Sequence, residues 1–309
     1  MGTERRRGRR LPFVDMGIFV IQVLNSLFYA SVLFLIASGL TLIFGVMRIV
    51  NLAHGSLYAV GAYITAWLVG HAVAGGFTAG GLIYLLLLPL GAIGVGVLGA
   101  LLEPSLLRPF YQRAEEYQLL VTFGLLLILE DGIRFIWGGV PLAADAVADT
   151  LPSVKILGFL YPAYNFVVIA VGVVAVLALW GFVYRTRFGV LLRATAQDRR
   201  MASALGLDVR RVYLLAFTIG CFMAGIGGAI VVPSQAAVLG MGIDALVVAF
   251  IVVVIGGMGS LKGALVGALI VSFFRTIGVE FFPEEELAFL YLLAGIVLVV
   301  RPTGLFGTA

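Results

Sequence analysis

The chain of 309 residues is mostly apolar: 62% of its residues are hydrophobic and 12% are charged, with a net charge of +4 and a mean hydropathy of +1.13. Soluble domains carry about 25% charged residues, so this composition excludes an ordinary water-soluble enzyme. At about 20 residues per membrane-spanning helix, ten spans need about 200 residues and leave too few for a second globular domain. We therefore predict an all-α membrane protein that forms one polytopic helical bundle.

Composition also narrows the chemistry. The 40 glycines are typical of closely packed membrane helices. The single cysteine, Cys221, lies in an apolar run, so we expect neither a disulfide framework nor a cysteine-based metal site. No cluster of nucleophile and base or of metal ligands is visible, and the arginines only punctuate apolar runs. We expect no catalytic residues, no metal, no cofactor bound by this chain and no nucleic acid partner.

The apolar runs predict about ten spans (eight to ten), of which the second and the eighth are short. Residues 1–15 form a basic tail, residues 16–301 form the membrane domain, and residues 302–309 form a second tail. The predicted spans, in chain order, are Met16–Ser38, Gly39–Val50, Leu57–Ala74, Gly81–Leu102, Gln118–Trp137, Tyr161–Tyr184, Val212–Val232, Ala245–Ile255, Gly263–Ile277 and a last span that ends at Arg301.

The positions of the basic residues predict the orientation. An even number of crossings puts both termini on one side, and the inner segments then hold 17 of the 20 basic residues. Seven of these arginines lie in the segment 185–211, and five lie in the tail 1–15. Because inner loops are enriched in Lys and Arg, we place both termini and the segment 185–211 in the cytoplasm.

Two places interrupt the apolar pattern with polar or glycine-rich backbone, at residues 51–56 and 256–263. Both lie next to unusually short spans, and such interruptions in corresponding positions indicate a translocation pathway. The alternative is a tight cytoplasmic hairpin at each place, and His54 then serves as a helix cap or binds a nearby carbonyl group. The candidate pathway residues are Asn51, His54, Gly55, Gly256, Gly257 and Ser260.

Charged residues also occur near the end of the fifth predicted span. Glu130 and Arg134 are four residues apart, and on a helix this spacing allows them to pair on one face. We expect a structural ion pair there rather than a proton relay.

The arginine-rich segment contains a second candidate site. Residues Arg193–Leu205 are predicted to form a short helix that presents an apolar face with Met201, Ala202 and Leu205. Gly206 is a good C-terminal stop, and Asp208 can cap the next helix. A rigidly attached helix of this kind favours docking to a partner protein; the alternative is a helix on the surface of anionic lipid.

Taken together, these motifs resemble the permeases of branched-chain amino acid ABC importers, and most closely the LivH-type subunit. The resemblance extends from about residue 17 to residue 307. It is carried by the order and joint presence of GLTLIFG (39–45), NLAHG (51–55), RATAQD (193–198), MASALG (201–206), GGMGS (256–260) and GA (263–264).

This resemblance implies a permease subunit of the bacterial cytoplasmic (inner) membrane that works with other chains. The implied partners are a LivM-type permease subunit, two cytoplasmic ABC ATPase subunits that hydrolyse ATP, and an extracytoplasmic solute-binding protein. The ATPase-coupling segment would contain Arg200, which stands where the general ABC-permease pattern has a glutamate, together with Met201, Ala202, Leu205, Gly206 and Asp208.

Two other functions are compatible with the sequence. A sugar-type ABC permease shares the bundle and the coupling segment. A channel or ion-coupled secondary transporter needs neither an ATPase nor a coupling segment, but few acidic residues occur in the middle of the predicted spans. No P-loop occurs, because Lys262 of the glycine-rich run is followed by Gly263 and not by Ser or Thr.

Overall fold

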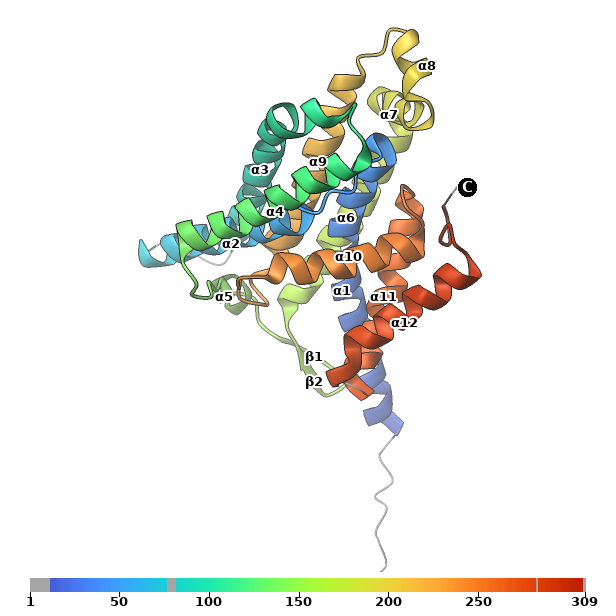
Figure 1. The fold of residues 1–309 in the computed structure, drawn as a ribbon. Coiled ribbons are helices and arrows are strands. Elements are labelled where there is room, and N and C mark those ends of the chain that lie inside the picture. Colours follow the sequence, from blue (N-terminus) through green and yellow to red (C-terminus); the bar gives the residue numbers. More distant parts are fainter. Residues whose placement is uncertain (1–11, 77–81, 282, 308–309) are drawn as a thin grey trace, which may run out of the picture.

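A computed structural model describes residues 12–76, 82–281 and 283–307, and it shows a bundle of helices with one small hairpin (Figure 1). Apolar side chains of α1 and α9 fill its centre. Short π-helical and 3₁₀ turns occur at Glu103–Leu107, Arg108–Phe110 and Pro283–Glu285. The helices and strands are α1 (Pro12–Met47), α2 (His54–Ala74), α3 (Leu82–Leu102), α4 (Glu115–Trp137), α5 (Asp145–Asp149), β1 (Val154–Ile156), β2 (Phe159–Tyr161), α6 (Ala163–Arg185), α7 (Arg187–Gln197), α8 (Arg199–Ala204), α9 (Val209–Val231), α10 (Met241–Gly256), α11 (Leu261–Phe281) and α12 (Glu286–Val300).

Within residues 12–76, 82–281 and 283–307, six helices are long and apolar enough to cross a membrane: α1, α2, α3, α6, α9 and α11. The first two predicted spans are wrong as separate elements, because residues 12–47 form one helix. At 1.5 Å per residue this helix is about 54 Å long, well beyond the hydrocarbon core of about 30 Å. The division at Gly39 assumed that no helix exceeds the membrane. In the structure the helix continues through Gly39, whose lack of a side chain lets Gly220 of α9 approach.

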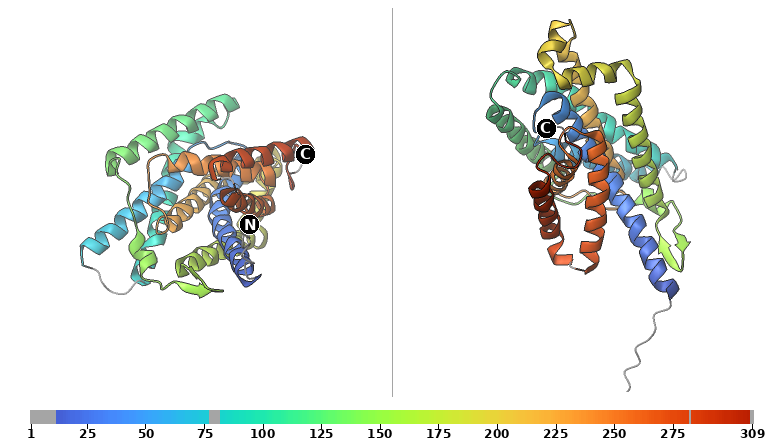
Figure 2. Two further views of the ribbon diagram at one scale, coloured as in Figure 1. Left: turned by 90° about the horizontal axis from the view of Figure 1, so that it is seen from below. Right: turned by 90° about the vertical axis from the view of Figure 1, so that its right-hand side faces the viewer.

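Joining the two spans changes the position of the amino end of α1. Gly17 lies against the ring of Phe159 in β2, so the first turns of α1 lie beside the β-hairpin (Figure 2, right). Helices α7 and α8 lie at the opposite end of the bundle (Figure 1). The described start of the chain and the arginine-rich segment are therefore at opposite ends, in contrast to the prediction that both termini share its side. Most of the predicted basic tail, residues 1–11, lies outside the described residues.

The bundle contains two similar halves that run in opposite directions. In the first half, α2 contacts α3 and the central helix α9; in the second, α10 contacts α11 and the central helix α1. Helix α1 makes its main contacts with α11, and α9 makes its main contacts with α3. Helices α1 and α9 run antiparallel (Figure 1), so the two halves have opposite directions, as the halves of an inverted repeat do.

The two halves meet where the first turns of α2 and α10 cross. Gly55 and Gly242, each the second residue of its helix, contact the other's backbone so closely that neither position has room for a β-carbon. The start of α2 therefore lies against the start of α10. The apolar pattern did not indicate this contact, because the start of α10 carries no polar cluster like that at 51–56.

Candidate functional site

The segment 185–211 forms two short helices rather than the predicted single helix. Asp198 separates them: its carboxylate accepts hydrogen bonds from the backbone N–H groups of Arg200 and Met201 at 2.8 and 2.9 Å, and so begins α8. An aspartate in this position is a recognisable N-cap signal. The sequence analysis missed it because the apolar pattern appeared continuous from Arg193 to Leu205.

The predicted end of the segment is confirmed. Gly206 has a φ of +81°, the left-handed conformation that ends a helix, and the N–H of Leu207 closes the turn on the carbonyl of Ala202. Asp208 then caps α9 through the N–H of Arg211 at 3.2 Å and pairs with the Arg211 side chain at 2.8 Å. Helix α8 is thus fixed rigidly to α9, whose later turns lie in the core.

Helix α8 stands at the tip of the bundle (Figure 1). Met201 is 57% exposed and Leu205 is 74% exposed, whereas Ala202 is buried on the inner side of α8. The predicted apolar face is therefore present for two of its three residues, and Arg200 beside it is exposed. A short, rigid knob with two exposed apolar side chains is suited to insertion into a groove of another protein.

A polar cluster that the sequence did not reveal supports this knob. The buried Glu103 accepts hydrogen bonds from Arg108, at 2.7 Å, and from the hydroxyl of Tyr111. The ring of Tyr111 packs edge-on against Tyr213 of α9, and the guanidinium of Arg199 lies 5.6 Å from that second ring. Glu103 and Arg108 are five residues apart, and they come together because residues 103–107 are π-helical. A search for pairs three or four residues apart, as in an α-helix, therefore does not find them.

The electrostatics of this cluster favour a neutral tyrosine. Burial and the hydrogen bond to Glu103 raise the pKa of the Tyr111 hydroxyl well above its ordinary range. The hydroxyl therefore stays protonated and remains a hydrogen-bond donor to the carboxylate. In this way the cluster links the end of α3 to the first turns of α8 and α9.

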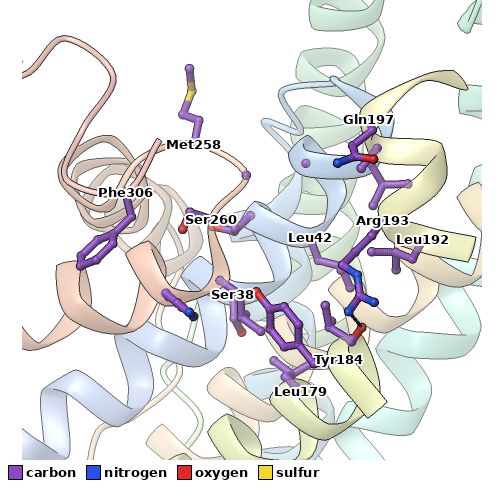
Figure 3. A pocket seen from close by; sticks show the side chains of 18 of the residues that line it. Ser38, Leu42, Leu179, Tyr184, Leu192, Arg193, Gln197, Met258, Ser260 and Phe306 are labelled. Atoms are coloured by element: carbon purple, nitrogen blue, oxygen red, sulfur yellow. Dashed lines mark hydrogen bonds between the residues drawn. The ribbon is translucent and has the colours of Figure 1, made fainter. Parts of the chain in front are cut away.

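Helix α7, which precedes this knob, borders a cavity of about 580 Å³ at the same end of the bundle (Figure 3). Arg193 and Gln197 of α7 lie on one side of this inner cavity, Ser38 and Leu42 of α1 form its floor, and Ser260 lies across from α7. Arg193 is held in place by a 2.6 Å hydrogen bond to the carbonyl of Val183 and by the Tyr184 ring, 5.2 Å from its guanidinium. The cavity thus joins two regions that the sequence analysis treated separately.

The glycine-rich turn itself is tightly packed. Gly256 contacts Gly263 backbone to backbone, and Gly257 contacts Gly307. The N–H groups of Leu305 and Phe306 donate to the carbonyls of Ile255 and Gly256, both at 2.9 Å. The predicted tail 302–309 is therefore packed on this turn as far as residue 307. Of the three pathway candidates in this region, Ser260 alone lines the inner cavity.

The other three pathway candidates lie inside the bundle. Asn51, His54 and Gly55 are buried, and none of them lines the inner cavity. His54 does not cap α2; its Nε2–H donates to the carbonyl of Ile36 in α1 at 3.0 Å, which matches the predicted alternative of carbonyl binding. Both amide atoms of Asn51 are buried without a hydrogen-bond partner.

One polar contact differs from its prediction. Within the described chain no ion pair joins Glu130 to Arg134. Glu130 of α4 instead accepts a 3.2 Å hydrogen bond from the hydroxyl of Ser56, next to the crossing of α2 and α10. The two residues are 74 positions apart, so no local pattern in the sequence could indicate this contact.

Comparisons with known proteins identify the family. The branched-chain amino acid transport system / permease component family matches residues 22–301. The chain is 28% identical to the high-affinity branched-chain amino acid permease protein BraD of Pseudomonas aeruginosa over 304 residues, and 28% identical to LivH of Escherichia coli over 300 residues. Each alignment covers 94% of this chain and 96% of the relative. The permease protein LivM of Escherichia coli is 27% identical over 95% of this chain and 71% of its own length. The chain therefore belongs to this family as a LivH-type permease, a multi-pass protein of the cytoplasmic membrane.

Proposed function

We propose that the chain is one permease subunit of an ATP-driven importer that carries branched-chain amino acids into the cell. The proposed partners are a LivM-type permease subunit, two cytoplasmic ATPase subunits and an extracytoplasmic solute-binding protein, with membrane lipid around the bundle. ATP hydrolysis belongs to the ATPase subunits, and this chain supplies part of the passage. The family and the relatives named for branched-chain amino acid transport support this proposal.

The observation that carries the proposal is the construction of α8. An exposed knob is capped at its start by Asp198, ended by Gly206 and fixed by Asp208 to a helix of the core. A partner that moves α8 therefore moves α9, and through it the crossing of the two inverted halves. Motion produced by an ATPase at one end of the bundle thereby reaches the helices that would open and close a passage.

For the passage we retain the residues predicted from the sequence. Ser260 would contact solute at the inner cavity, where α7 can follow the movement of α8. Asn51, His54 and Gly55 would lie at the closed centre, and Gly256 and Gly257 would shape the turn that carries Ser260. The buried and unpartnered amide of Asn51 supports this assignment, since such a group gains a partner when water or solute enters.

The proposal is tested by transport in proteoliposomes that contain the chain and its four partner subunits. Labelled L-leucine should accumulate when ATP is present on the ATPase side and the binding protein on the other, while labelled ribose should not. Accumulation of ribose would instead indicate a sugar permease. Leucine uptake by the purified chain alone, driven by an ion gradient without ATP, would refute the proposal.

A further inference from the structure

Glu130 lies in an unusual place for a carboxylate. Its helix, α4, covers the first turns of α2, and Glu130 accepts its hydrogen bond from Ser56 one residue beyond the Gly55–Gly242 contact. His54, two residues before Ser56, lies against Gly39 of α1, which in turn contacts Gly220. Gly220 is the middle residue of α9, which is long and apolar enough to cross a membrane, so this series of contacts connects Glu130 to the middle of α9.

A carboxylate in a membrane bundle needs a partner or access to water, because a charge in hydrocarbon is costly. The Ser56 hydroxyl binds Oε1, and Oε2 accepts no hydrogen bond within the described chain. The hydroxyl of Tyr63, two turns along α2, is buried and also has no partner, although it lies within electrostatic range of Glu130. Oε2 of Glu130 and, two turns farther along α2, the Tyr63 hydroxyl are thus both without a hydrogen bond in the described chain.

The neighbouring residues do not neutralise Glu130. Asp131 and Arg134 are both exposed, and the latter forms no ion pair in the described structure. A carboxylate with one oxygen free and a hydroxyl beside it is a favourable environment for an ammonium group, which has three donors and no acceptor. Every amino acid substrate carries such a group at its α-carbon, whereas a sugar does not.

We propose that Glu130, assisted by the hydroxyls of Ser56 and Tyr63, binds the ammonium group of the amino acid as it crosses the membrane. The inference deepens the proposed function and rests on it. It assigns to α4 the recognition of the substrate's charged head by an opposite charge, which none of the six predicted pathway residues supplies, since none of them is acidic.

The site contains its own spectroscopic reporter, because the ring of Trp137 packs 5.6 Å from that of Tyr63. The full transporter is labelled with 5-fluorotryptophan, and the Trp137 resonance in ¹⁹F NMR is assigned by its loss in Trp137→Phe. L-Leucine is then titrated against 4-methylpentanoate, which has the same carbon skeleton and carboxylate but no ammonium group. ATP-driven leucine uptake is measured on the same variants.

Leucine should shift the Trp137 resonance and 4-methylpentanoate should not. In Glu130→Gln, the leucine concentration needed for the shift should rise about tenfold or more, the effect of losing one charge-assisted hydrogen bond. Uptake should fall in parallel. The matched control is Asp131→Asn, which removes the adjacent carboxylate and should behave as the wild type.

A merely structural contact between α2 and α4 gives a different result. Ser56→Ala breaks that contact and removes one assisting hydroxyl but leaves the carboxylate, so the leucine concentration needed for the shift should rise by less than in Glu130→Gln; a rise as large as in Glu130→Gln would overturn the proposal. An equal response to 4-methylpentanoate, an unchanged titration in Glu130→Gln, or an equal effect of Asp131→Asn would also overturn it. If Glu130→Gln does not assemble, the analogue comparison decides. Failure of wild-type uptake alone would refute the proposed function, while the titration would still test Glu130.

Discussion

Replacement of Gly206 tests whether the rigid attachment of α8 transmits movement. The φ of +81° at this position disfavours any residue with a β-carbon, and most strongly a β-branched one. No atom lies within 4 Å of where a β-carbon would be placed, so the cost is backbone strain alone. For Gly206→Val we expect about 2 kcal/mol of strain. This strain shifts the equilibrium between the native and altered orientations of α8 by a factor of about 30 toward the altered ones. Gly206→Asn is the matched control, because asparagine tolerates the left-handed conformation.

The assay is leucine uptake per ATP hydrolysed in proteoliposomes, with equal amounts of assembled transporter confirmed by size-exclusion chromatography. The Val variant should hydrolyse ATP but transport little, since α8 no longer passes its movement to α9. The Asn variant should transport nearly as well as the wild type. Equal transport per ATP in the Val variant, the Asn variant and the wild type would refute the reasoning about α8.

Three further outcomes follow from the structure. Gly55→Ala forces a β-carbon into the backbone of α10 and should cost about 2 kcal/mol or more, seen as a lower melting temperature in detergent, whereas Gly70→Ala, with open space around it, should not. Because the pKa of Tyr111 is raised in the fold, the protonated hydroxyl contributes its full stabilisation below a pH of about 10, and this stabilisation is lost as the pH rises further. The melting temperature of Tyr111→Phe should therefore fall less steeply at high pH than that of the wild type. A cysteine at Met16 should react with an impermeant thiol reagent from outside and one at Gln197 from inside; labelling of both from one side would contradict the opposite placement of α1 and α7.

Much of the fold could be predicted because apolar length is a strong signal in membranes. The predicted span Gly81–Leu102 ends where α3 ends, and Gln118–Trp137 ends where α4 ends. The split of α1 failed because the prediction used membrane thickness as a limit on helix length. Nothing in an apolar run shows that a helix extends beyond the membrane.

The candidate site was predictable where its signal is local. Gly206 and Asp208 end and begin helices through contacts within a few residues, and both predictions are confirmed. The contacts Ser56–Glu130 and Glu103–Arg108 were not predictable: the first depends on how α2 and α4 cross, and the second on a π-helical turn. The role of the six pathway residues remains a prediction.

The packing of residues 305–307 onto the glycine-rich turn has a practical consequence for work with this protein. Leu305 and Phe306 supply the donors for Ile255 and Gly256, and Phe306 also lines the inner cavity. A truncation before Leu305 would expose two carbonyl groups and open one wall beside Ser260. Affinity tags and fluorescent fusions at this end therefore need a flexible spacer after residue 307, so that residues 305–307 stay packed on the glycine-rich turn.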